Sequence, residues 1–193
     1  MRRAGTWAAG GLLWAATAVA GDFIWTTNGN EAALAKYAGT GGDVEIPSAV
    51  DGRPVAAIRP DAFADCAGLT RVAIPDSVVR IEEQAFAYCT GLTNVSIGRG
   101  VSSIGEGAFH GCGQLANLSV HALNPAYGSA DGALFDQRQS TLVLCPARKT
   151  GSYAIPSGIV AIGNEAFAHC AGLTDIALPE SLVRIGDWAF DSS

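Results

Sequence analysis

The chain has 193 residues and a formal net charge of −6 at pH 7. Its length fits a single domain. The acidic balance, without clusters of lysine or arginine, argues against nucleic acid and anionic lipid as partners. The cysteines number five, and an odd number argues against a complete disulfide framework.

Residues 1–20 have the features of a secretory signal peptide. Arg2 and Arg3 precede a mostly apolar stretch, and Ala-Val-Ala at 18–20 forms a small-x-small cleavage site before Gly21. The stretch is too short for a membrane span, and no later stretch is long enough either. We therefore predict a secreted or cell-surface protein with no membrane span after cleavage; an uncleaved anchor is the alternative. Residues 1–20 carry two arginines and no acid, so the rest has ten basic and 18 acidic residues, a charge of −8.

Residues 21–43 precede the first repeat, and we interpret them as an N-terminal cap. Phe23, Ile24 and Trp25 predict a short strand, and residues 28–30, Asn-Gly-Asn, predict a turn. A repeat protein needs such a cap because its first coil would otherwise expose an apolar end and an open strand edge.

Residues 44–193 repeat a pattern of apolar positions at a step of 23 residues. Self-similarity at this period predicts a solenoid of the leucine-rich-repeat type. The repeat at 118–152 is irregular and 12 residues longer than the 23-residue step, and the last repeat, 176–193, is incomplete. The recurring positions include Phe63, Phe86, Phe109, Phe167 and Phe190; Cys66, Cys89 and Cys112; and Leu69, Leu92 and Leu115.

Each coil is expected to begin with a strand and to end on a turn or short helix. Val72 and Ile74 alternate with Arg71 and Ala73, which predicts a half-buried strand. A proline closes this strand in four coils, because proline has no N–H to continue a ladder. The polar-then-apolar segment at 82–86 predicts one helical or 3₁₀ turn. The whole is predicted as a right-handed coil with a parallel concave sheet and short helical turns on the convex side.

The long repeat departs from this rule. Residues 124–132 are rich in turn-forming types, and two short apolar runs, 133–135 and 141–144, flank a polar link. We predict that this coil replaces its convex helix with a β-hairpin. Irregular insertions on solenoids often carry function, so Phe135 and Gln137 are candidate partner-binding residues.

The repeat pattern resembles the BspA-like class of leucine-rich repeats. The resemblance is carried by Ile-Pro-x-Ser-Val-x-x-Ile-Gly-(3)-Ala-Phe-x-x-Cys-x-x-Leu, by the lead-in at 41–47 and by Asp-Gly-Ala-Leu-Phe at 131–135. It covers residues 43–193. It implies a secreted or cell-surface protein, mostly bacterial and often adhesive, that binds partners without catalysis. It supplies no catalytic residue and no cofactor.

The cysteines and histidines receive structural interpretations. Stacked coils would place Cys66, Cys89 and Cys112 about 5 Å apart, which suits buried free thiols or one disulfide. His110 and His169 occupy different positions of the repeat, so we expect surface histidines that do not stack. No Cys-x-x-Cys or other metal-ligand spacing is present, and no nucleophile motif or phosphate loop is found.

The concave strand face is the expected binding surface of a solenoid. Its outward residues are small and weakly polar, and Arg71 is the one strong anchor because interface hot spots favour Trp, Tyr and Arg. The sequence thus predicts a secreted, non-enzymatic protein-interaction module that binds a protein or host-surface ligand. A structural spacer within a larger surface protein is the alternative, and the open last coil suggests self-association. The candidate partner-binding residues are Arg71, Asn94, Asn117, Asp175, Phe135 and Gln137.

Overall fold

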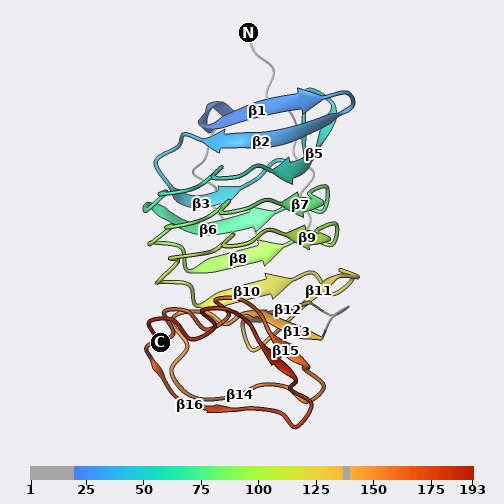
Figure 1. The fold of residues 1–193 in the computed structure, drawn as a ribbon. Helices are drawn as coiled ribbons and strands as arrows, with labels where there is room; N and C mark the ends of the chain where they lie inside the picture. The colour runs from blue at the N-terminus through green and yellow to red at the C-terminus, as the bar shows by residue number, and fades with distance from the viewer. Residues whose placement is uncertain (1–19, 137–139) are drawn as a thin grey trace.

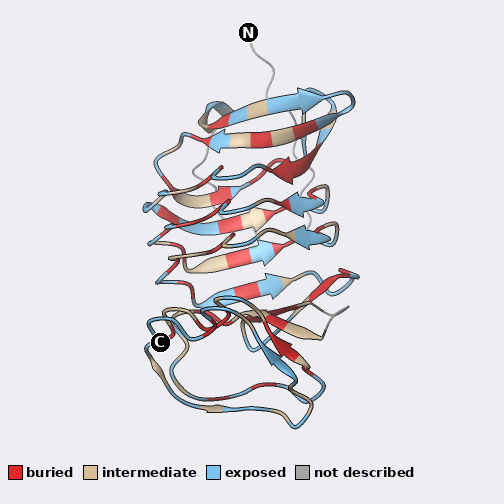
Figure 2. Cartoon of the chain, in the orientation of Figure 1, coloured by how far each residue is buried: buried red, intermediate tan, exposed pale blue. Residues whose placement is uncertain are grey.

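The computed structural model describes residues 20–136 and 140–193. Apart from Ala20, the predicted signal peptide lies outside the described residues. The chain winds into coils that stack along one axis, with the N-terminal strands at one end (Figure 1). Buried residues recur in coil after coil along this stack (Figure 2). This arrangement confirms the predicted leucine-rich-repeat solenoid.

Four coils contribute to a parallel sheet, which we call the main sheet. Its strands are β3 (Gly42–Glu45), β6 (Leu69–Ile74), β8 (Asn94–Ile97) and β10 (Asn117–Val120), in the order β10-β8-β6-β3. Val72 and Ile74 are buried, whereas Arg71 is exposed. The predicted alternation of inward apolar and outward polar residues is therefore confirmed.

A second sheet runs along the next side of the coils and includes the cap. The cap is an antiparallel hairpin of β1 (Phe23–Asn28) and β2 (Glu31–Tyr37), and β2 pairs in parallel with β5. Another short hairpin joins β4 to β5 through Asp51 and Gly52. The remaining strands are β4 (Ala49–Val50), β5 (Arg53–Ile58), β7 (Arg80–Ile81) and β9 (Ser103–Ile104).

The third side of each coil, which we call the turn side, contains no helix within the described ranges. The predicted short helices are therefore wrong, and the one 3₁₀ helix described is Ala20–Asp22. Gln84 and Tyr88 have φ values of 53° and 57°, and the equivalent residues of other coils are also positive. A left-handed residue at both positions interrupts the right-handed helical path, so the segment becomes a chain of turns.

Aromatic rings stack in a column behind the turns, as predicted from the repeat. Tyr37, Phe63, Phe86 and Phe109 follow one another with ring centroids 4.8 to 5.3 Å apart. A second column joins Phe167 to Phe190, with ring centroids 5.2 Å apart. The buried residues divide into two clusters, and the long repeat contributes residues to both of them.

The long repeat breaks the regular stack. Its predicted hairpin is confirmed as β12 and β13, and β11 adds a third antiparallel strand. In the described part of the chain, β10 does not pair with β14, so β14 and β16 form a separate two-stranded sheet. The strands are β11 (Tyr127–Ala130), β12 (Ala133–Asp136), β13 (Thr141–Leu144), β14 (Gly151–Ala154), β15 (Ala161–Ile162), β16 (Leu173–Ala177) and β17 (Arg184–Ile185).

Asn124 anchors the start of this insertion to the preceding coil. It is the buried polar side chain of the described core. Its Nδ2 donates to the carbonyls of Gly98 and Val101, and its Oδ1 accepts from the N–H groups of Ala126 and Tyr127, all at 2.9 Å. Two of these bonds reach the preceding coil and two hold the backbone that leads into β11, so Asn124 sets the direction in which the insertion leaves the coil.

Candidate functional site

Three of the sequence-predicted site residues lie in one column on the main sheet. Arg71 is in register with Asn94, and Asn94 is in register with Asn117. Asp43 precedes them in the same column, and its carboxylate lies 3.6 Å from the Arg71 guanidinium. These residues lie side by side on one sheet, and Arg71 has an ion-pair partner within it.

The other predicted residues lie elsewhere. Asp175 is on β16 beside Ser152 of β14, in the separate two-stranded sheet, so the column does not continue to it. Phe135 is buried in the second core cluster, and its side chain packs inward instead of forming an exposed contact. Gln137 lies outside the described residues. The structure therefore does not unite the six predicted residues into one site.

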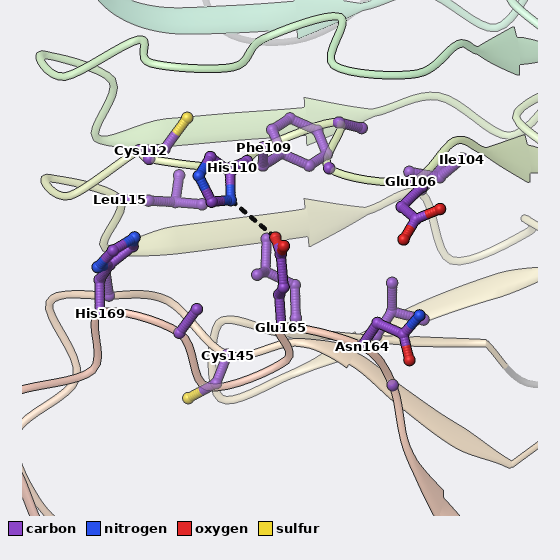
Figure 3. Close-up of a pocket in the computed structure, with 18 of the residues that line it drawn as sticks. Ile104, Glu106, Phe109, His110, Cys112, Leu115, Cys145, Asn164, Glu165 and His169 are labelled. Carbon is purple, nitrogen blue, oxygen red and sulfur yellow. Dashed lines mark hydrogen bonds and ion pairs between the residues drawn. The ribbon is translucent and has the colours of Figure 1, made fainter. Parts of the chain in front are cut away.

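A hollow lies on the turn side, between the turn that contains Cys112 and the turn that contains Cys170. The intervening long repeat lacks the Ala-Phe-x-x-Cys turn here. After β12 and β13, its chain crosses this side by the shorter segment 145–150. The cleft has a volume of about 300 Å³. One wall is residues 104–112, the opposite wall is residues 163–169, and β13 with residues 145 and 147 lies behind them (Figure 3).

An ion pair crosses this cleft. His110 Nδ1 lies 2.7 Å from Glu165 Oε2, which joins the two walls (Figure 3). Beyond the pair lies a smaller hollow of about 140 Å³, which Trp188 and Asp191 also line.

The two histidines contact each other, which the sequence did not predict. The ring of His169 meets the ring of His110 edge to face, with centroids 5.8 Å apart. They occupy different positions of the repeat, but the missing turn brings the next coil directly against His110. The ring of Tyr88 also meets the ring of His110 edge to face, with centroids 5.2 Å apart.

The backbone ladder of the turn side stops at the cleft. In the preceding coil, the N–H groups of Gln84, Phe86 and Tyr88 donate hydrogen bonds to carbonyls of the following coil at 2.7 to 3.1 Å. The equivalent donors of the next coil are the N–H groups of Gly107, Phe109 and Gly111. Within residues 20–136 and 140–193, these three N–H groups have no hydrogen-bond acceptor. The cleft wall therefore presents three backbone donors in a row.

The chemistry of the cleft suits binding better than nucleophilic catalysis. Cys145 lines it, but a hydrogen bond with Cys170 and burial raise the pKa of the Cys145 thiol. A thiol must ionise to act as a nucleophile, and these interactions keep it protonated. No group of three metal-ligating side chains forms in the part of the chain that the structure describes.

Sequence reasoning missed this cleft. The signal was present in the length of the long repeat and in the absence of an Ala-Phe-x-x-Cys segment at its expected place. We used that signal to predict the hairpin but not its consequence for the coils on either side. A coil without its turn leaves a gap one layer thick between its neighbours.

Comparisons with known proteins agree with this architecture. The BspA type leucine rich repeat region, in six copies, matches residues 55–130 and 147–193, which leaves out most of the hairpin. No curated protein matches the chain. Among the described residues, no helix has the length and apolar character of a membrane span.

Solved structures with the same fold come from several bacteria. The leucine-rich repeat protein of T. pallidum, TpLRR, is 27% identical, with a TM-score of 0.62 over 91% of this chain and 88% of its own. A leucine-rich repeat protein from Eubacterium ventriosum is 19% identical, with a TM-score of 0.53 over 82% and 56%. The pneumococcal vaccine antigen PcpA is 18% identical, with a TM-score of 0.51 over 89% and 66%.

Proposed function

Because the chain belongs to the BspA type leucine-rich repeat family, we propose that it is an exported, non-enzymatic module that binds a partner protein at a cell surface. The signal-peptide features of residues 1–20 support export. The pneumococcal vaccine antigen PcpA shares the fold of this chain.

The observation that carries the proposal is the polar column of the main sheet. Asp43, Arg71, Asn94 and Asn117 follow one another in register across four strands. Their side chains are exposed or half-buried, and the strands beneath them are fixed by a buried apolar layer. A rigid parallel sheet of this kind offers a partner a preformed surface, which reduces the entropic cost of binding.

Arg71 is the residue that we expect to contribute most to partner binding. Arginine is enriched among interface hot spots. The Asp43 carboxylate lies beside the Arg71 guanidinium, and Thr70 orders this carboxylate by donating a hydrogen bond to Asp43 Oδ1 at 2.7 Å. The face has few apolar side chains, so the partner surface should be polar and should carry an acidic group opposite Arg71.

The test measures binding of the full chain to intact cells and to a panel of immobilised extracellular proteins by interferometry. We expect saturable binding that Arg71→Ala weakens about tenfold, the range of a single hot spot. Arg99→Ala is the matched control, because Arg99 is also exposed and paired with a carboxylate, Asp76 at 3.2 Å, away from the main sheet.

A structural spacer is the second possibility. The exposed face of the main sheet is made mostly of small residues, and a spacer needs no more than a stable stack. If no ligand gives saturable binding, or if Arg71→Ala and Arg99→Ala behave alike with every ligand, the spacer explains the protein better.

A further inference from the structure

The cleft on the turn side is surrounded by the side chains that protein interfaces favour. Tyr88 and Trp188 are exposed at half or more of their surface, and His110 and His169 lie close to them. The main sheet lacks such aromatic residues. Tyrosine and tryptophan are enriched at hot spots because they bury large areas at low entropic cost.

The wall of the cleft also has the backbone pattern that accepts another segment of chain. Gly107, Phe109 and Gly111 direct N–H groups to the place where the turn of the next coil would lie. In the adjacent coil, the same three positions are bonded to carbonyls of the next turn. A peptide from another molecule could supply these carbonyls, as an added strand does at a sheet edge.

The aromatic column stops at the same place. Phe109 stacks on Phe86 with an interplanar angle of 5°, and it lines the cleft on its other side. The next ring in the solenoid, Phe167, packs against Tyr153 and Phe190 instead. Apolar side chains of Ile104, Leu115 and Val143 line the cleft together with Phe109. The transfer of an aromatic side chain from water into the cleft would therefore have a favourable free energy.

We propose that this cleft binds an extended peptide segment of a partner protein. The segment inserts one aromatic side chain beside Phe109, and its flanking carbonyls accept hydrogen bonds from Gly107, Phe109 and Gly111. The proposal does not depend on the main sheet being a binding surface, because the cleft lies on a different side of the coils.

The size and charge of the cleft restrict the segment. A volume of about 300 Å³ is at the lower end for ligand pockets, so it suits one side chain with its adjoining peptide groups and not a folded element. Glu106 and Asp191 lie at the rim of the hollows and are exposed. We therefore expect a segment that is neutral or basic next to its aromatic residue.

The His110–Glu165 pair lies in the path of the segment. The two side chains cross the layer that a guest would occupy, so binding requires them to swing aside. Both are partly exposed, and an exposed ion pair contributes at most about 1 kcal/mol. The pair therefore slows entry without closing the cleft.

The test follows the amide signals of the ¹⁵N-labelled full chain by NMR during titration with the peptide acetyl-Ala-Phe-Ala-Lys-amide. We expect saturable downfield shifts and slower hydrogen exchange at Gly107, Phe109 and Gly111, because new hydrogen bonds protect amide protons. The control peptide acetyl-Ala-Ala-Ala-Lys-amide has the same backbone and charge but no ring, and it should bind at least about tenfold more weakly.

Two tryptophan substitutions test whether the amide shifts arise from peptide binding in the cleft. Ala168 lines both hollows, whereas Ala64 occupies the same position of the repeat in the first coil and is half-buried to a similar degree. Ala168→Trp should fill the cleft and abolish the shifts, while Ala64→Trp should preserve them. If Ala168→Trp does not fold, Trp188→Ala serves instead and should weaken binding.

Three outcomes would overturn the proposal. These are shifts confined to β3, β6, β8 and β10, equal shifts with both peptides, and no shifts up to the solubility limit of the peptide. Each is distinct from the outcome for the main sheet, because the Arg71→Ala experiment uses other ligands and leaves the cleft unchanged.

Discussion

The rings of Phe86 and Phe109 lie 5.3 Å apart and are parallel to within 5°. They belong to successive coils, so each ring is buried by its neighbour and neither coil could bury its own. We expect Phe86→Ala to lower the free energy of unfolding by about 3–5 kcal/mol, because the truncation leaves a cavity between two layers.

Chemical denaturation followed by circular dichroism measures this loss. Glu83→Ala is the control, since Glu83 is an exposed residue of the same turn. Its effect should stay within about 0.5 kcal/mol. Similar midpoints for the two variants would mean that the aromatic column does not stabilise the stack.

The second prediction concerns the anchor of the insertion. Asn124→Ala removes four hydrogen bonds from a buried site, two donated by Nδ2 and two accepted by Oδ1, so we expect a loss of at least about 2 kcal/mol. Asn124→Asp keeps the acceptors for Ala126 and Tyr127 but cannot donate to the carbonyls of Gly98 and Val101, and it should be destabilised as well.

The matched control is Asn30→Ala, which removes an exposed asparagine from the turn of the cap hairpin. Thermal unfolding by calorimetry compares the three variants. A melting temperature for Asn124→Ala equal to that of Asn30→Ala would show that the four hydrogen bonds do not stabilise the folded protein.

The regular coils could be predicted from the sequence because each side chain recurs in the same environment. Phe63, Phe86 and Phe109 identify the column, and Val72 with Ile74 identifies the inward face of a strand. The prediction failed for the turns, where Gln84 and Tyr88 adopt positive φ. Non-glycine residues in that region are uncommon, and these side chains give no local sign of it. Gly107 and Gly111, at the same positions of another coil, were the available indication.

The cleft could not be predicted from any one repeat. It arises because the long repeat omits a turn, so its walls come from coils that are more than 50 residues apart in sequence, as the His110–Glu165 contact shows. Alignment of the repeats placed His110 and His169 at different positions, and only the three-dimensional stack brings them together. The column of Arg71, Asn94 and Asn117 was predictable, since it follows from the register alone.

The third prediction concerns Tyr153. Burial raises the pKa of its hydroxyl to about 12, and within the described chain this hydroxyl has no hydrogen-bond partner. Tyr153→Phe removes an unsatisfied buried group while keeping the ring, over which Lys149 Nζ lies at 4.8 Å from the centroid. We expect the variant to be as stable as the wild type at pH 7, or up to about 1 kcal/mol more stable.

The same substitution should change the response to alkali. Because the pKa of Tyr153 is higher in the folded protein than the value of 10.0 for an unperturbed tyrosine, the unfolded state releases this proton first. Stability is thus retained below pH 10 and is lost as the pH rises toward 12. Urea unfolding from pH 8 to 11.5 should show a smaller loss for Tyr153→Phe than for the wild type. Parallel curves would contradict the assigned burial of the hydroxyl.

The fourth prediction concerns the thiols. All five cysteines are free, and four are buried, whereas Cys66 is partly exposed. Cys89 donates to the carbonyl of Phe63 at 3.1 Å, and a hydrogen bond with Cys112 and burial raise the pKa of its thiol. We expect a thiol reagent at pH 8 to label Cys66 first and the others only as the protein unfolds.

Mass spectrometry of the labelled protein identifies the modified residues with time. In denaturant, all five cysteines should react without prior reduction. A protein that shows three reactive thiols until a reductant is added contains a disulfide, and Cys66→Ser would then test whether the stacked column supplies it.

The last prediction concerns the exposed end of the solenoid. Val183 and Trp188 are exposed over 79% and 73% of their surface, and Ile185 on β17 over 52%. Within the described residues, β16 and β17 each have a neighbouring strand on one side. An apolar end with free backbone groups favours pairing with another chain. The 193-residue chain should therefore associate with itself as its concentration rises.

Sedimentation velocity over a range of concentrations measures this association. Val183→Lys places a charge in the exposed end and should keep the chain monomeric, because burying an unpaired ammonium at an interface is costly. Leu123→Lys is the control, since Leu123 is 71% exposed but lies in the long repeat, away from the end. Association that both variants weaken equally would point to general surface charge, and association that neither weakens would place the contact on another face.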